Sequence, residues 1–174
     1  MVKKVLAILP VSIGGRLTTN SIINGFRQND CDVVVYDELF GENFEKLLKQ
    51  NFDLIVGYDF SGLKIKIDNN LNIKSCNYFS DEIRSKTSGP EWQKYLPYLK
   101  NDDNYTFYWD EHLAQQENFK NLFYMPHFVD FEIYKDLKIP PTYDVMFAGR
   151  LDTDFRLNFF ENLMEKLPDV QFAW

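Results

Sequence analysis

Four aspartates stand at, or just after, the ends of segments whose residue pattern predicts β-strands: Asp37, Asp59, Asp81 and Asp110. The carboxyl ends of parallel strands lie along one edge of a sheet, and open α/β sheets bind ligands in the crevice outside that edge. Four carboxylates on one edge repel one another unless a cation or a hydroxyl-rich ligand lies among them, so we expect at least one raised pKa. The alternative is structural, because aspartate is common at strand ends and in turns.

A pair of glycines follows the first apolar run of the chain. Residues 5–9 are all apolar, Pro10 ends the run, and Gly14 and Gly15 are predicted to form a loop with positive φ that lets the backbone approach a ligand. Hydroxyl and amide side chains at residues 18–21 are predicted to cap a helix, whose free N–H groups would favour an anion or a sugar hydroxyl. The alternative is that the two glycines only make a tight turn.

These residues need a parallel sheet to bring them together. The apolar runs predict strands at residues 5–9, 32–39, 53–58, 73–79, 105–109 and 121–125, with helices at 19–28, 42–50 and 111–119. Residues 60–71 fit either a short helix or an exposed excursion, and residues 84–104 predict an irregular, lid-like segment with helical pieces around 92–99. This alternation predicts an α/β fold, a doubly wound (Rossmann-like) parallel sheet flanked by helices.

Composition excludes several classes of function. The net charge is −7 and there is no basic run that would neutralise successive phosphates, so nucleic acid is not expected as a partner. The two cysteines, Cys31 and Cys76, match no metal or disulfide pattern, which is typical of a reducing cytoplasm. No signal peptide or transmembrane segment is predicted, although peripheral contact with a membrane stays open.

A second α/β rhythm begins near the end of the chain. Pro140, Pro141 and Thr142 predict a stiff linker, and a strand at 144–148, a helix from Thr153 and a strand at 169–174 follow. We therefore divide the chain into a domain at 1–140 and a linker with a first β-α-β piece of a second domain at 141–174. So short a piece cannot bury its own core. Residues 144–174 are expected to extend the first domain's sheet or to dock against a neighbouring copy, as in a dimer.

Three segments together carry a resemblance to a known family. They are the amino-terminal strand leading into Gly14-Gly15, the run from Met125 to Asp130 (MPHFVD) followed by Tyr134, and residues 147–151 (FAGRL). In this order and spacing the chain resembles the two-domain GT-B glycosyltransferases, and within them the spore-maturation CgeB-like and group 4-like enzymes. It departs from their pattern at His127-Phe128, where Asn-Gly is commoner, and it lacks the lysine that usually follows the FAGRL-like segment.

The resemblance implies two facing nucleotide-binding-like domains, the first holding an acceptor and the second a nucleotide-sugar donor as co-substrate. It implies that Gly14, Gly15 and Arg16 line the cleft and that Arg150 and Arg156 lie near the donor diphosphate, where guanidinium groups would neutralise the leaving group. No metal or other cofactor is implied. The acidic residues that hold the donor sugar would lie beyond this sequence, so the chain alone is expected to be an incomplete and inactive hexosyltransferase-like enzyme.

Within this reading, Asp81 and then Asp59 are the candidates for the base that deprotonates an acceptor hydroxyl, because both end central strands near the glycine pair. His112 and His127 are the only histidines, and a lone histidine is more often structural than catalytic. Aromatic side chains at Trp92, Tyr95 and Tyr98 would suit stacking on a sugar, but their helical spacing is more typical of core packing.

Two rival functions remain open. A dinucleotide-dependent oxidoreductase would use Asp37 or Glu38 to bind ribose, but residues 13–18 do not supply G-x-G-x-x-G. A non-enzymatic receiver-like or interaction domain of flavodoxin-like topology would need acidic residues after the first strand, where Pro10-Val11-Ser12 offers none.

Overall fold

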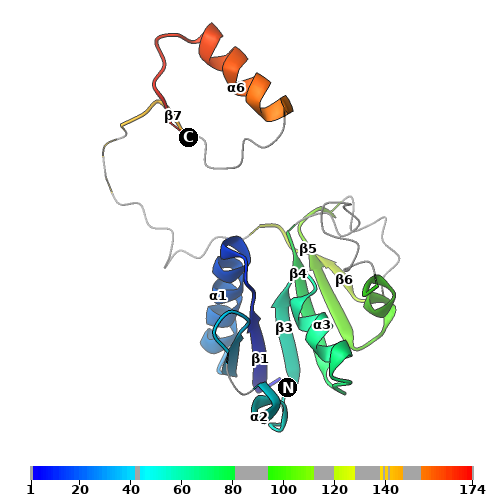
Figure 1. Cartoon of the computed structure of the whole chain (residues 1–174). Coiled ribbons are helices and arrows are strands. Elements are labelled where there is room, and N and C mark those ends of the chain that lie inside the picture. The colour runs from blue at the N-terminus through cyan, green and yellow to red at the C-terminus, as the bar shows by residue number, and fades with distance from the viewer. Residues whose placement is uncertain are drawn as a thin grey trace. The chain divides into compact units, whose positions relative to one another are not determined.

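The computed structural model describes residues 2–41, 44–80, 94–111, 120–127, 138, 140, 142–146 and 154–173 (Figure 1). The chain divides into two compact units, Met1–Asp130 and Phe131–Trp174.

The first unit is built on a parallel sheet. Its strands in the described residues are β1 (Lys4–Leu9), β2 (Asp32–Asp37), β3 (Leu54–Tyr58), β4 (Lys74–Phe79), β5 (Asn104–Tyr108) and β6 (Leu122–Tyr124), in the spatial order β2-β1-β3-β4-β5-β6. Each neighbouring pair is parallel. The predicted doubly wound α/β fold is confirmed, and β1 lies inside the sheet.

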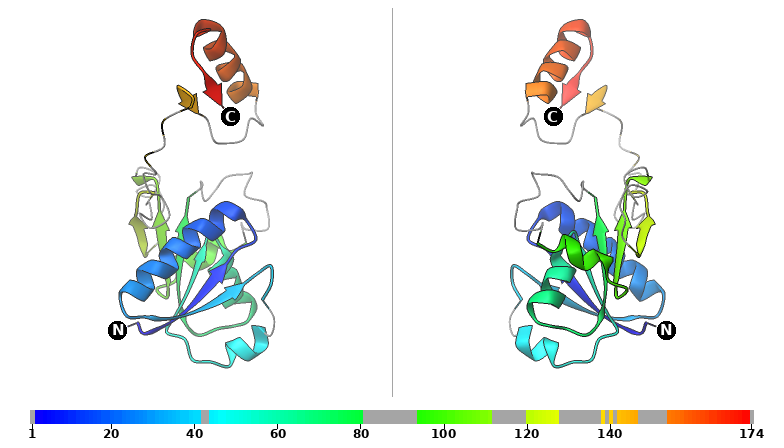
Figure 2. Two further views of the ribbon diagram at one scale, coloured as in Figure 1. Left: turned by 90° about the vertical axis from the view of Figure 1, so that its left-hand side faces the viewer. Right: turned by 90° about the vertical axis from the view of Figure 1, so that its right-hand side faces the viewer.

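Helices cover both faces of this sheet (Figure 2). Helix α1 (Ile13–Gln28) packs with Ile23 against the face that carries Val5, Ala7 and Val56. The opposite face is covered by α2 (Phe44–Leu48), α3 (Ser61–Asp68) and the 3-10 helix η2 (Leu96–Lys100). Right-handed crossovers explain why the helices lie on different faces. The connection from β1 to β2 runs in one direction across the sheet, and the connections between the later strands run in the other.

The core follows from the apolar runs. Residues 5–8 of β1 and Ile55 of β3 are completely buried, as expected for strands covered on both faces. On the α3 side, Leu63, Tyr95 and Leu99 pack with the strand residues Phe79 and Tyr108. The expectation that Tyr95 belongs to the core is therefore confirmed, whereas the side chain of Tyr98 is exposed.

The prediction of a glycine loop is wrong. Gly14 and Gly15 lie in the first turn of α1, which begins six residues before the predicted start. The N-cap is Ser12, whose Oγ accepts a hydrogen bond of 3.3 Å from the Gly15 N–H, so the residues at 18–21 do not cap the helix. A Cβ on Gly15 would lie 2.6 Å from Ser12 Oγ and 2.8 Å from Pro10 and Tyr58, so this glycine is required by close packing.

Other boundaries differ less. Strand β2 ends at Asp37 rather than at residue 39, and α2 covers only five residues of the predicted 42–50. Residues 60–71 contain the helix α3, and the helical piece predicted around 92–99 is η2. Residues 112–119 of the predicted helix and residues 84–93 of the lid-like segment lie outside the described residues.

Helix α3 starts very close to the sheet. A Cβ on Gly57 of β3 would lie 2.4 Å from the Gly62 nitrogen and 2.4 Å from Ser61 Oγ. The side chain of Asn77 in β4 then accepts a 3.1 Å hydrogen bond from the Leu63 N–H. This amide satisfies one of the free donors at the start of the helix.

The second unit contains β7 (Val145–Met146), α6 (Asp154–Lys166) and β8 (Phe172–Ala173), with the two strands paired in parallel. The carboxylate of Asp144 accepts a 2.9 Å hydrogen bond from the Gln171 N–H. None of the described side chains of α6 is buried, and Phe155 and Phe159 are exposed.

Among the helices in the described part of the chain, none has the length and hydrophobicity needed to span a membrane. Within the same residues, no group of three or more His, Cys, Asp or Glu side chains is placed to hold a metal ion.

Candidate functional site at the carboxyl edge of the sheet

The carboxyl ends of β1 and β3 mark the point where the chain connections leave the sheet in opposite directions. The order β2-β1-β3-β4-β5 is the flavodoxin-like one, in which ligands bind at the switch between the first and third strands. Pro10 and Ser12 follow β1 there, and Gly15 packs against Tyr58 at the end of β3. This edge is therefore where the fold itself favours a ligand.

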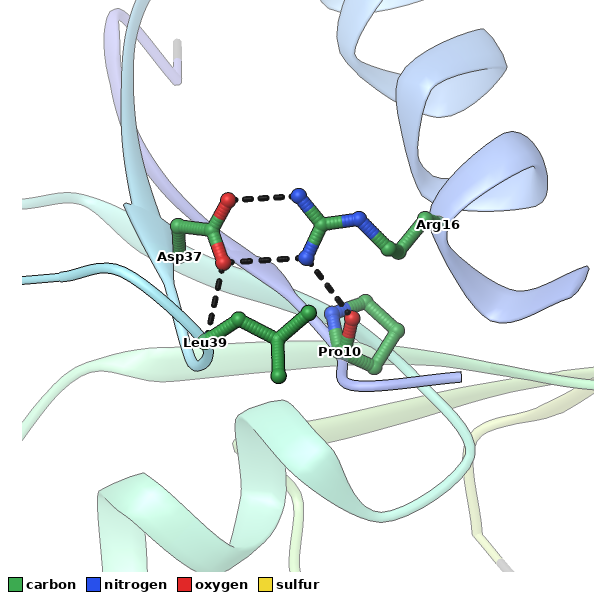
Figure 3. Close-up of polar contacts among 4 residues, drawn as sticks. All are labelled: Pro10, Arg16, Asp37 and Leu39. Atoms are coloured by element: carbon green, nitrogen blue, oxygen red, sulfur yellow. Dashed lines mark hydrogen bonds and ion pairs between the residues drawn. The ribbon is translucent and has the colours of Figure 1, made fainter. Parts of the chain in front are cut away.

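An ion pair fixes one side of this edge (Figure 3). Two nitrogens of the Arg16 guanidinium donate to the two carboxylate oxygens of Asp37, at 2.9 and 2.5 Å. Arg16 also donates to the carbonyl of Pro10 at 3.2 Å, and Asp37 accepts from the Leu39 N–H at 2.8 Å. The pair thus joins the start of α1, the loop after β1 and the end of β2.

This pair changes the electrostatics expected for the row of aspartates. The hydrogen bonds from Arg16 lower the pKa of Asp37 to about 2, so this carboxylate is stabilised rather than repelled. The raised pKa occurs one residue later, because burial raises the pKa of Glu38. Glu38 lines a cavity of about 440 Å³ between α2 and α3, together with Val11 and Lys64.

Asp59 is the described candidate base, and it has an unusual backbone. It follows β3 directly, with a φ of 49°, a left-handed conformation that aspartate tolerates better than most residues. Its N–H donates to the carbonyl of Tyr78 at 2.8 Å, which holds the turn against β4. One of its carboxylate oxygens is buried. Asp59 therefore lies just past the end of a central strand, as predicted.

Asp81, the other candidate base, lies outside the described residues. Asp110 is described, and it lies two residues beyond the end of β5. Arg150 lies outside the described residues, and Arg156 is exposed on α6 in the second unit. Gly14 is exposed on the first turn of α1, where a Cβ would meet no atom within 4 Å.

A set of aromatic and hydroxyl side chains occupies the same edge over β3, β4 and β5. We call it the carboxyl-edge cluster, and its members are Tyr58, Tyr78, Ser80, Trp109 and His127. The phenol of Tyr58 hydrogen-bonds to the hydroxyl of Ser80, and the phenol of Tyr78 hydrogen-bonds to Nδ1 of His127 at 3.1 Å. The His127 ring stacks on Trp109, with the centroids 5.2 Å apart and the planes 16° from parallel.

The chemistry of this cluster is hydrogen bonding and stacking. Burial, and then the nearby Tyr58, raise the pKa of Tyr78 to about 12, so its phenol stays neutral and keeps its proton at physiological pH. His127 is exposed, and a buried tyrosine and a tryptophan fix its ring. The indole Nε1 of Trp109 is buried and has no hydrogen-bond partner within the described residues.

Sequence reasoning missed most of this cluster. Its members are far apart in the sequence, 49 positions in the case of Tyr78 and His127, and no spacing pattern singles out a lone histidine. One signal was available, because Tyr58 and Tyr78 both fall at the ends of predicted strands and are direct partners in the parallel register. His127 also stands in the MPHFVD segment that carries the family resemblance.

Comparison with known proteins identifies no family: no family model matches the chain, and no curated protein and no solved structure matches it.

Proposed function

We propose that this chain is the acceptor-side part of a glycosyltransferase that transfers a sugar from a nucleotide-sugar donor to a hydroxyl acceptor. The acceptor would bind at the carboxyl edge of the first unit's sheet. Arg150 and Arg156 would bind the donor diphosphate, as the family resemblance implies. The donor is a co-substrate, and no metal is needed in this scheme.

The observation that carries the proposal is the carboxyl-edge cluster. Proteins bind sugars by stacking apolar ring faces on aromatic side chains and by hydrogen-bonding the hydroxyl groups. Trp109 and His127 form a stacked pair, and Tyr78 and Ser80 add hydroxyl groups beside it. The cluster begins with Tyr58 at the end of β3 and extends along the carboxyl edge, outside which open α/β sheets bind their ligands.

Asp59 has the role of general base in this scheme. Its carboxylate would take the proton from the acceptor hydroxyl as that oxygen forms a bond to the anomeric carbon of the donor. The bond between that carbon and the nucleotide diphosphate would break, and the electron pair would leave with the diphosphate oxygen. Asp81 is the alternative base.

The rival oxidoreductase is less well supported. Both carboxylate oxygens of Asp37 accept hydrogen bonds from Arg16, so this residue is engaged where a dinucleotide enzyme would bind ribose. Gly14 and Gly15 are helical and do not form a dinucleotide-binding turn.

A flavodoxin-like binding module is the second candidate, and the strand order favours it.

Binding measurements separate the three classes. We expect glucose to raise the melting temperature of this chain, and NAD(P) and acetyl phosphate with magnesium to leave it unchanged.

Two matched variants then test the site. Trp109→Phe keeps a ring but removes the buried indole donor, and it should weaken sugar binding. Tyr124→Phe removes an exposed phenol on β6, outside the cluster, and it should bind as the wild type does. Equal binding by both variants, or stabilisation by acetyl phosphate alone, would contradict the proposal.

A further inference from the structure

An apolar groove of about 540 Å³ runs between α1 and the sheet. One wall is formed by Ile22, Gly25 and Phe26 of α1, and the other by Val56, Cys76 and Phe107 of the central strands. None of the described residues that line the groove is charged. Its volume lies within the range of roughly 300–1,000 Å³ that is typical of small-ligand sites.

The topology explains why the described helices leave part of this face uncovered. In the first unit, α1 is the described helix that packs on this face, because only the connection from β1 to β2 runs in that direction. Helix α1 lies over β1 and β3, so the neighbouring strands present their apolar side chains beside it. Phe107 stacks on the half-exposed Phe123 there, with the ring centroids 5.5 Å apart.

The groove is continuous with the carboxyl-edge cluster. Tyr78 lines the groove, and its phenol is the group that hydrogen-bonds to His127. Met125 also lines the groove and lies two residues before His127, and its N–H donates to the Tyr108 carbonyl at 2.9 Å. A ligand with its polar part at the cluster would therefore place any attached chain in the groove.

We propose that the groove binds the apolar chain of an amphiphilic acceptor, whose hydroxylated head lies at the carboxyl-edge cluster. The position of the hydroxylated head rests on the proposed function, whereas the position of the alkyl chain rests on the groove itself. The uncharged lining argues against a peptide with charged side chains and against a nucleotide, because either would leave buried charges without partners. An alkyl chain needs no hydrogen bonds, so the apolar lining suits it.

Alkyl glucosides of different chain length, used below their micelle concentrations, test the proposal. Burial of each added methylene should tighten binding about fourfold. Octyl glucoside should therefore bind roughly 15-fold more tightly than hexyl glucoside. Equal affinities for the two glucosides would overturn the proposal.

A pair of glycines on α1 offers a matched control. A Cβ at either Gly14 or Gly25 would meet no atom within 4 Å, but only Gly25 lines the groove. Leucine is a better helix former than glycine, so both variants should fold. We expect Gly25→Leu to abolish the dependence on chain length and Gly14→Leu to retain it. A Gly25→Leu variant that keeps the full dependence would contradict the proposal.

Self-association of the chain supplies a further outcome. Oligomers of the wild-type chain that Gly25→Leu abolishes would overturn the proposal, because the groove would then be an interface between copies.

The head and the chain can fail separately. Suppose that octyl chains bind equally well with a glucose head or an oligo-ethylene glycol head, and that His127→Ala changes neither affinity. The groove is then supported as a binding site, and the proposed glycosyltransferase site is contradicted. If glucose binds through His127 but the length of the alkyl chain has no effect on affinity, the proposed function is supported and the groove inference is contradicted.

Discussion

Replacing Gly57 by alanine should displace the start of α3 and the turn that holds Asp59. A Cβ at position 57 would lie 2.4 Å from the Gly62 nitrogen, 2.4 Å from Ser61 Oγ and 2.9 Å from the Gly62 Cα. Two of these three atoms belong to the backbone and cannot rotate away. The helix must therefore move off β3, and it carries with it the residues between Tyr58 and Ser61.

The magnitude follows from this geometry. Inserting a methyl group into a well-packed interior costs typically about 1–3 kcal/mol. The loss of glycine's freedom in the unfolded chain offsets about 0.4–1 kcal/mol of that. We expect a net loss of about 1–2 kcal/mol in the free energy of unfolding. For a chain of this size, this corresponds to a fall of roughly 2–8 °C in melting temperature.

Far-UV circular dichroism during urea and thermal unfolding measures this loss. Gly25→Ala is the matched control, because its Cβ meets no atom within 4 Å and lies in a helix, so this variant should gain up to about 1 kcal/mol. Gly57→Ala should also weaken sugar binding, since the Asp59 turn moves. A Gly57→Ala protein as stable as the wild type would refute the account of how α3 is positioned.

Three further outcomes are expected. The pKa of Asp37 is lowered from its ordinary value of 3.8 to about 2 in the folded chain, so its stabilisation is present above about pH 4 and is lost as the pH falls toward 2. Asp37→Asn should flatten this decline in urea unfolding, and an unchanged decline would contradict the role of the ion pair. Ser12→Ala removes the N-cap of α1 and should cost about 1 kcal/mol in the free energy of unfolding, whereas no change would show that the 3.3 Å bond contributes nothing. Burial raises the pKa of Cys76 to about 12, so its alkylation at pH 8 should be far slower in the native protein than in urea. Mass spectrometry measures the two rates, and equal rates would contradict the burial of this thiol.

The fold was largely predictable because its strands are encoded locally. Residues 5–9 form an uninterrupted apolar run, and such a run predicts a strand covered on both faces. The start of α1 was not predictable, because two adjacent glycines favour a loop on their own. Pro10 and Tyr58 lie too close to Gly15 to leave room for a Cβ, so the glycine at this position reflects long-range packing and not a loop.

The site was less predictable because its interactions are long-range. Asp37 was correctly placed at a strand end, but its partner Arg16 is 21 residues away, and only the parallel register of β1 and β2 brings them together. At Asp37, an ion pair with Arg16 is therefore found in place of the predicted repulsion among aspartates. In the same way, no local pattern pairs Tyr78 with His127.

The most direct test of the central claim is the nuclear magnetic resonance signal of the Trp109 indole N–H during a titration with octyl glucoside. The signal can be assigned with Trp109→Phe, because the chain has only three tryptophans. We predict a saturable shift of this signal that His127→Ala abolishes. A Trp109 signal that does not move while octyl glucoside binds would contradict the assignment of the carboxyl edge as the sugar site.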